Sequence, residues 1–217
     1  MLFGKVVLAA TAFSLTISVA NSALAEPAAP QSPHLVMNQS NKISPILGPA
    51  TSEQQLIGYF GAKNVKRQKV SLGEGETADG TVIFPNDAKR RASFVWKNTK
   101  KRDVPETIFV CDKPSLWRLP NEITTGTTLI ELEKLNGKPF KMTGFDWDGG
   151  GTVTSWNGGK LETTLKSKSG KVSATLQLVP TSTHYPDELV GDKAILSSNA
   201  NMRKLNPTVG TVNILAP

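Results

Sequence analysis

The chain has a single cysteine and two histidines among its 217 residues. One cysteine, Cys111, excludes an intrachain disulfide, so the fold must depend on its own apolar core. Cys111 ends a short apolar, strand-like run, and we expect a buried, unreactive thiol there. The two histidines, His34 and His184, lack metal-ligand spacing to other donors. We therefore predict neither a metal site nor a cofactor.

Long apolar runs are also scarce, and the one that exists lies near the N-terminus. Residues 6–20 are apolar, follow Lys5 and precede a small-x-small site that ends at Ala25. This pattern is typical of a signal peptide over residues 1–25, cleaved before Glu26. The run is too short for a membrane span, and Glu26, not a cysteine for lipid attachment, comes directly after the cleavage site. We expect a periplasmic or secreted protein without a transmembrane segment in the mature chain.

Negative charge is sparse between residues 63 and 102, a segment that contains eleven basic residues and four acidic ones. The whole chain carries +7, and loss of Lys5 with the signal peptide leaves +6. One interpretation is an anion-binding surface for an anionic envelope polymer or an acidic protein. The other is a set of solvated turns. Nucleic acid is not an expected partner, because the protein is exported and aromatic residues do not alternate with these charges. The candidate anion-binding residues are Lys89, Arg90, Arg91, Lys100, Lys101 and Arg102.

The most informative stretch runs from residue 122 to residue 162. Thr128 and Glu131 have the spacing of a capping box, and apolar residues follow at helical intervals. Ile130 is expected to widen the apolar face. Gly137 and Pro139 end the pattern, because glycine accepts a positive φ and proline cannot continue a helix. We predict a short, one-sided helix.

Strand patterns follow this helix. Residues 140–145 and 152–156 are predicted strands, joined by the glycine run 149–151. Asn157-Gly158 is typical of a tight turn, and residues 160–165 resume a strand-like alternation.

The first hairpin carries a candidate ligand-binding site, made of Asp146, Trp147, Asp148 and Trp156. The tryptophans favour core packing or a ligand-stacking platform. The aspartates allow three interpretations: turn hydrogen bonds, a paired acid–base site, or metal ligation. Turn bonding is favoured, because Gly150 and Asn157 occupy positions where a calcium loop needs further oxygen ligands.

The rest of the chain fits one domain. We expect a flexible leader over 26–41 and a single domain over 42–217. A second capped helix begins near Ser52 and ends at Gly61, and strand patterns follow it too. This similarity predicts two tandem helix-plus-hairpin repeats, over 42–104 and 121–179, with closing strands over 193–215.

A threonine-capped short helix that stops at a glycine and a proline, before a glycine-rich hairpin, resembles the repeat unit of β-lactamase-inhibitory-protein-like and outer-membrane assembly lipoprotein-like domains. The residues that carry this resemblance are Gly126, Thr127, Leu132, Leu135, Gly137 and Pro139. It implies helices packed on an antiparallel sheet, but not inhibition of β-lactamase. The absent lipidation cysteine departs from the lipoprotein pattern. The stretch 144–159 is also similar to a group of uncharacterised exported bacterial proteins.

These observations predict an α+β fold with short helices packed on a mostly antiparallel sheet. No nucleophile elbow is present, and Ser182-x-His184 is too local for a catalytic triad. We therefore expect a non-enzymatic, exported cell-envelope module that binds a protein or a ligand, an inhibitor being one version. Two alternatives stay open: attachment to anionic envelope polymers, and a hydrolase that uses Asp146 and Asp148.

Overall fold

The structure is a computed structural model that describes residues 51–73, 75–165 and 173–215. The predicted signal peptide over 1–25, its cleavage site at Ala25 and Glu26, and the predicted leader over 26–41 lie outside the described residues. Within the described ranges, no helix is long and apolar enough to cross a membrane.

The fold is α+β, as predicted, and the strand ladders of the described residues are antiparallel. In chain order the elements are α1 (Glu53–Phe60), the 3₁₀ helix η1 (Ala62–Asn64), β1 (Val65–Gly73), β2 (Glu76–Ile83), β3 (Ala92–Trp96), β4 (Pro105–Val110), η2 (Pro120–Glu122), α2 (Leu129–Asn136), β5 (Lys141–Thr143), β6 (Val153–Ser155), α3 (Leu161–Thr164), β7 (Ser173–Val179), η3 (Asp187–Leu189), β8 (Ala194–Leu196), α4 (Ala200–Leu205) and β9 (Thr208–Leu215).

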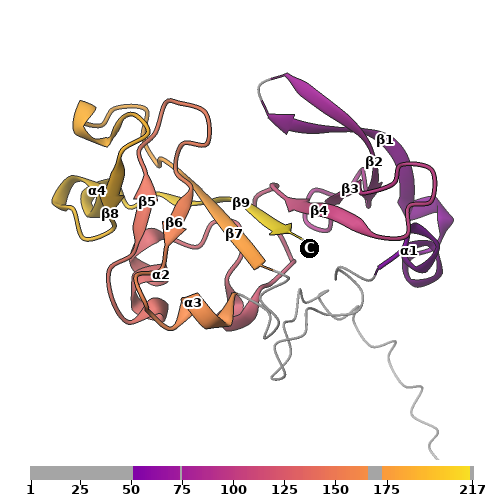
Figure 1. Ribbon diagram of the computed structural model, residues 1–217, viewed down its shortest axis with the longest axis horizontal. Coiled ribbons are helices and arrows are strands. Elements are labelled where there is room, and N and C mark those ends of the chain that lie inside the picture. Colours follow the sequence, from indigo (N-terminus) through magenta and orange to yellow (C-terminus); the bar gives the residue numbers. More distant parts are fainter. Residues whose placement is uncertain (1–50, 74, 166–172, 216–217) are drawn as a thin grey trace, which may run out of the picture. The chain divides into compact units, whose positions relative to one another are not determined.

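The larger sheet has six strands in the order β1-β2-β3-β4-β9-β7. Strands β1 to β4 follow one another as a meander, whereas β9, the last of the described strands, lies between β4 and β7 (Figure 1). The pair Ile108–Ile214 and the pair Leu176–Val212 set the register on the two sides of β9. These side chains are almost completely buried, so β9 contributes to the centre of the core.

The smaller sheet has three strands in the order β6-β5-β8. As predicted, β5 and β6 form an antiparallel hairpin across the glycine run, with Met142 paired to Val153. The hairpin is joined to the larger sheet, because the Leu178 N–H in β7 donates to the Gly151 carbonyl at 2.8 Å. Gln177 adds a side-chain bond to the Gly150 carbonyl at 2.9 Å.

Both predicted helices are confirmed, and both begin with a capping box. In α1, Ser52 caps the helix and pairs with Gln55; in α2, Thr128 pairs with Glu131. Ile130 does not widen the apolar face of α2 as expected, because its side chain is 42 % exposed. The buried face of α2 is formed by Leu129 and Leu132.

The predicted strand over residues 160–165 is wrong, because Leu161–Thr164 forms the short helix α3. The turn before it has the expected chemistry: Asn157 and Gly158 both have positive φ, at 55° and 67°. The chain then turns into a helix because buried Asn136 accepts a hydrogen bond from the Leu161 N–H at 3.1 Å. The alternation of residues within 160–165 cannot predict a hydrogen bond to a residue so distant in sequence.

Asn136 is expected to be a stabilising residue of this part of the fold. It is 1 % exposed, and its amide donates to the carbonyls of Trp156 and Lys138, each at 2.9 Å. Asn136→Ala should lower the free energy of unfolding by about 2 kcal/mol, because the buried Trp156 carbonyl and Leu161 N–H lose their partner. Urea unfolding monitored by circular dichroism measures this. Lys134→Ala on the exposed side of α2 should change stability little, and equal losses in both variants would contradict the role of Asn136.

Two further expectations concern the thiol and the internal repeat. Cys111 follows β4 and is exposed, so the expected burial is wrong. Burial of part of the residue nevertheless raises the pKa of its thiol, which keeps the thiol protonated at neutral pH.

The two proposed repeats share a helix followed by a hairpin, but β1–β2 lies in the larger sheet and β5–β6 in the smaller one. The duplication therefore stays a prediction.

Candidate functional site

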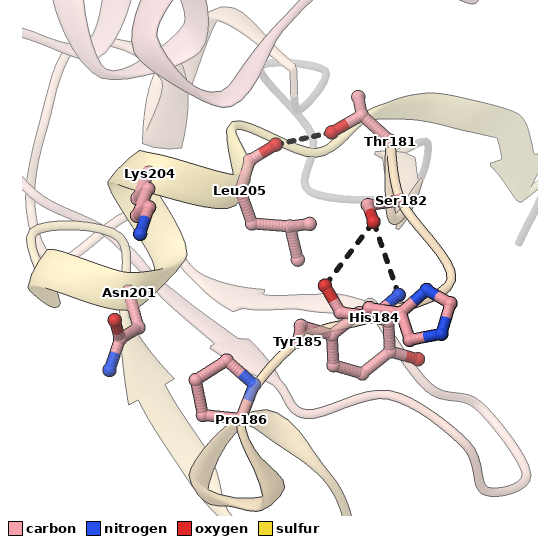
Figure 2. Close-up of a pocket in the computed structure, with 8 residues that line it drawn as sticks. All are labelled: Thr181, Ser182, His184, Tyr185, Pro186, Asn201, Lys204 and Leu205. Carbon is pink, nitrogen blue, oxygen red and sulfur yellow. Dashed lines mark hydrogen bonds between the residues drawn. The ribbon is translucent and has the colours of Figure 1, made fainter.

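Two adjoining hollows lie on either side of the loop that follows β7. The first, about 290 Å³, is formed by this loop and α4 (Figure 2). The second, about 360 Å³, extends to Asp146 in the glycine-rich hairpin. Thr181, Ser182 and Tyr185 line both. We call this pair of hollows the Tyr185 site.

The backbone positions the loop against the hairpin. The Phe145 N–H donates to the Leu189 carbonyl at 2.7 Å, and the Gly191 N–H donates back to the Phe145 carbonyl at 2.9 Å. Thr181 donates to the Leu205 carbonyl at the end of α4. These three bonds connect the loop to the small sheet and to α4, so the walls of the site are tied to regular structure.

Tyr185 and Asp146 form the central polar contact of the site. The Tyr185 hydroxyl donates to Asp146 Oδ1 at 2.8 Å, and the ring packs edge-on against Phe145 with centroids 5.5 Å apart. Burial, together with the hydrogen bond and the negative charge of Asp146, raises the pKa of Tyr185 to about 12. The phenol therefore stays protonated and holds Asp146 in place. Asp146 itself has φ 58°, a conformation that aspartate tolerates better than most residues.

The other lining groups offer donors and acceptors to a ligand. Lys204 and Asn201 come from α4 and lie opposite the loop in Figure 2. Asn201 is oriented by a 2.7 Å hydrogen bond from its amide to Glu188, whereas the Lys204 ammonium has no partner within the described part of the chain. Ser182 bonds to the backbone of His184, not to its ring. The ring nitrogen Nδ1 of His184 lies 3.1 Å from the Thr183 hydroxyl.

The four residues of the predicted ligand site are separated by the fold. Asp146 lines the Tyr185 site, as described above. Trp147 is 41 % exposed, and its indole N–H donates to the Gly144 carbonyl at 3.2 Å; it lines neither hollow. Asp148 is exposed. Trp156 is 6 % exposed and packs against Phe140 in the core, so it does not share a surface with Trp147.

The six candidate anion-binding residues also differ in their surroundings. Arg90 bonds to Asp87 at 2.6 Å, and Arg91 lies 3.5 Å from Asp112. Arg102 lies 3.6 Å from Glu53, with a side chain only 14 % exposed. The remaining three have exposed side chains without a carboxylate partner among the described residues: Lys89, Lys100 and Lys101. Anionic-polymer binding through these loops stays a prediction.

The hydrolase alternative needs two carboxylates that share a reacting group. Asp146 is bonded to Tyr185, and no interaction of the Asp148 carboxylate occurs within the described residues. Across the same residues, no group of three or more histidine, cysteine, aspartate or glutamate side chains could hold a metal ion. The hydrolase therefore stays a prediction, testable as loss of a bell-shaped pH dependence in Asp148→Asn.

Sequence reasoning missed Tyr185, Asn201 and Lys204. The loop over residues 180–188 contains a histidine, a tyrosine and hydroxyl residues, but without the spacing of a known catalytic motif. The signal in this loop is compositional: several polar side chains and an aromatic ring between two prolines. The hydrogen bond between Tyr185 and Asp146, which lies 39 residues earlier, could not be predicted from local spacing.

Titration of Tyr185 tests the central contact. The chain contains two tyrosines, so in a Tyr59→Phe background the absorbance change of tyrosine ionisation comes from Tyr185 alone. Its ionisation, followed by ultraviolet absorbance, is expected near pH 12. Adding Asp146→Asn removes the charge that opposes ionisation and should move the midpoint to lower pH. An unchanged midpoint would mean that Asp146 does not contact the phenol in solution.

Comparisons with known proteins found no match: no protein-family model, no curated protein and no solved structure is similar to this chain. The resemblance to β-lactamase-inhibitory-protein-like and outer-membrane assembly lipoprotein-like domains therefore stays a prediction.

Proposed function

We propose that the protein is an exported cell-envelope module that binds a hydroxyl-rich ligand, such as a saccharide, without catalysing a reaction. The observation that supports this most is the Tyr185 site itself: two hollows that share one aromatic ring, held by Asp146 at 2.8 Å. Small-molecule sites commonly combine an aromatic surface with a few fixed polar groups.

The chemistry of the lining favours this ligand class. Three hydroxyl side chains, an amide, an ammonium and a carboxylate surround the Tyr185 ring. A polyol can both donate to Asp146 and accept from Lys204, and its C–H face can pack on the ring. A strongly anionic ligand fits less well, because Asp146 would repel it. Export is part of the proposal and rests on the N-terminal sequence pattern, which cell fractionation would test.

The binding test uses the mature chain, from Glu26 to Pro217, and a panel of soluble envelope saccharides, including peptidoglycan fragments, measured by isothermal titration calorimetry. Tyr185→Phe keeps the ring but releases Asp146, and Lys204→Ala removes the unpaired ammonium. Each is expected to weaken binding roughly tenfold, which corresponds to one well-placed polar contact. Trp147→Ala, if the exposed indole extends the ligand surface, should weaken binding with the fold intact.

The matched control is Tyr59→Phe, which removes the hydroxyl of an exposed tyrosine on α1. Its affinity should equal that of the unaltered chain. The proposal fails if no saccharide binds, or if Tyr185→Phe and Tyr59→Phe bind equally well. Loss of folding in Trp147→Ala would assign that residue to stability alone.

A further inference from the structure

A further hollow, separate from the two of the Tyr185 site, is lined by residues between 63 and 90 and has a different chemistry. It encloses about 480 Å³ and is lined by η1, by the start of β1, and by the loop between β2 and β3. Three basic side chains reach it from these three segments: Lys63, Lys66 and Arg90. Two neutral amides, Gln68 and Asn86, complete the polar lining. We call it the cationic hollow.

The hollow carries an excess of positive charge. Asp87 is the acidic residue among those that line it, and its carboxylate is already bonded to Arg90 Nε at 2.6 Å. This hydrogen bond lowers the pKa of Asp87, so the pair stays ionised at neutral pH. Within the described part of the chain, the ammonium groups of Lys63 and Lys66 have no partner. Three cations against one carboxylate leave two uncompensated positive charges.

Arg90 is held in a fixed position with one edge available. Its guanidinium lies 4.2 Å from the centre of the Phe84 ring, and its backbone carbonyl accepts from the Trp117 indole at 2.8 Å. Asp87 occupies the Nε side, and the Nη atoms have no hydrogen-bond partner among the described residues. A guanidinium fixed in this way loses little freedom when it binds an anion.

Phe84 forms a rigid floor for the hollow. It is 6 % exposed, and Phe60 packs on it edge-on with centroids 5.1 Å apart. Its φ of 49° is uncommon for a bulky residue, and such strained residues gather at binding sites. Backbone bonds on both sides keep the conformation: the Phe84 N–H donates to Asn64, and the Asp87 N–H donates to Phe84.

We propose that the cationic hollow binds a phosphate group. Phosphate spreads its charge over several oxygens, which suits cations arriving from three directions and the open edge of Arg90. Arg90 belongs to both the hollow and the predicted loop surface, but Lys100 and Lys101 are not part of the hollow, so the two sites overlap without being the same. The inference also does not depend on the saccharide proposal. The phosphate belongs either to a free phosphorylated compound or to a lipid headgroup.

The test measures binding of two probes to the mature chain at low salt. Inorganic pyrophosphate represents the free source, titrated by calorimetry. Vesicles of phosphatidylglycerol with phosphatidylcholine represent the lipid source, with phosphatidylcholine vesicles as the blank. The variant Lys63→Gln/Lys66→Gln removes two charges without a described contact, and the control Lys100→Gln/Lys101→Gln removes two charges from the β3–β4 loop.

At least one probe should bind, and the Lys63→Gln/Lys66→Gln variant should bind it roughly tenfold more weakly, against less than twofold for the control. Which probe responds identifies the source. Equal weakening in the two variants would show a general charge effect and overturn the site. If neither probe binds, the proposed site is overturned as well. Tyr185→Phe should leave both affinities unchanged, so the result is independent of the Tyr185 site.

Discussion

Replacing Gly151 with alanine is expected to lower the free energy of unfolding by about 4 kcal/mol, the largest effect of any single substitution considered for this chain. A β-carbon at this position would lie 1.9 Å from the Leu178 carbonyl oxygen and 3.1 Å from the Phe145 ring. The φ of 77° adds a conformational cost for any residue with a side chain. Chemical denaturation, or loss of soluble protein, would measure the effect.

The neighbouring glycines supply matched controls. Gly149 also has positive φ, at 72°, but the nearest atom to an added β-carbon is 3.9 Å away. Gly149→Ala should therefore cost about 1 kcal/mol, the conformational term alone. Gly150 has ordinary φ and tight contacts of 3.0 to 3.3 Å, which a small shift relieves. If Gly149→Ala destabilises as much as Gly151→Ala, the close approach to β7 is not the cause.

Glu53 is expected to give the second large effect. The residue is 6 % exposed, and its carboxylate accepts from Arg67 Nε at 2.9 Å and from the Thr81 hydroxyl at 2.6 Å. Thr81 in turn accepts from the Trp96 indole at 2.9 Å, so the network links α1 to β1, β2 and β3. Glu53→Ala should lower the free energy of unfolding by about 3 kcal/mol, because it leaves Arg102 partly buried without its counter-charge.

Urea unfolding is the appropriate measurement, since guanidinium chloride would screen the charges. Gln54→Ala, at the next and exposed position of α1, should change stability by less than about 0.5 kcal/mol. Glu53→Gln should fall between the two, because an amide can still accept from Thr81. A Glu53→Ala chain as stable as Gln54→Ala would contradict the network.

The contribution of Glu53 should also depend on pH. Burial alone would raise the pKa of Glu53, but the hydrogen bonds from Arg67 and Thr81 and the nearby positive charges outweigh it and lower the pKa below its ordinary 4.5. The ionised form is thus favoured in the folded state. Its stabilisation is complete above the unfolded pKa and is lost as pH falls through the lower, folded value. The stability gap between the unaltered chain and Glu53→Gln should shrink below about pH 4.5.

Elements that depend on local chemistry were predictable from the sequence. Both capping boxes, the glycine stops of α1 and α2, and the glycine-run hairpin appear where the residues place them. Each signal lies within a few residues of the structure it produces, so tertiary contacts only reinforce it.

Features set by distant contacts were not predictable. Residues 160–165 alternate like a strand, but Asn136 supplies a hydrogen bond that starts a helix there. Three arginines of the basic region are paired with carboxylates from other parts of the fold: Arg67 and Arg102 with Glu53, and Arg91 with Asp112. The Tyr185 site is formed by a loop and a hairpin far apart in sequence. In each case the partner is chosen by the three-dimensional fold.

The place of β9 has a consequence for the order in which the larger sheet assembles. β9 follows the other described strands in sequence, yet it lies between β4 and β7 in the larger sheet. Until it arrives, β4 and β7 each have an unpaired edge, and open edges invite pairing with other chains. The six-stranded sheet is therefore complete only after residues 208–215 have paired with both of these strands.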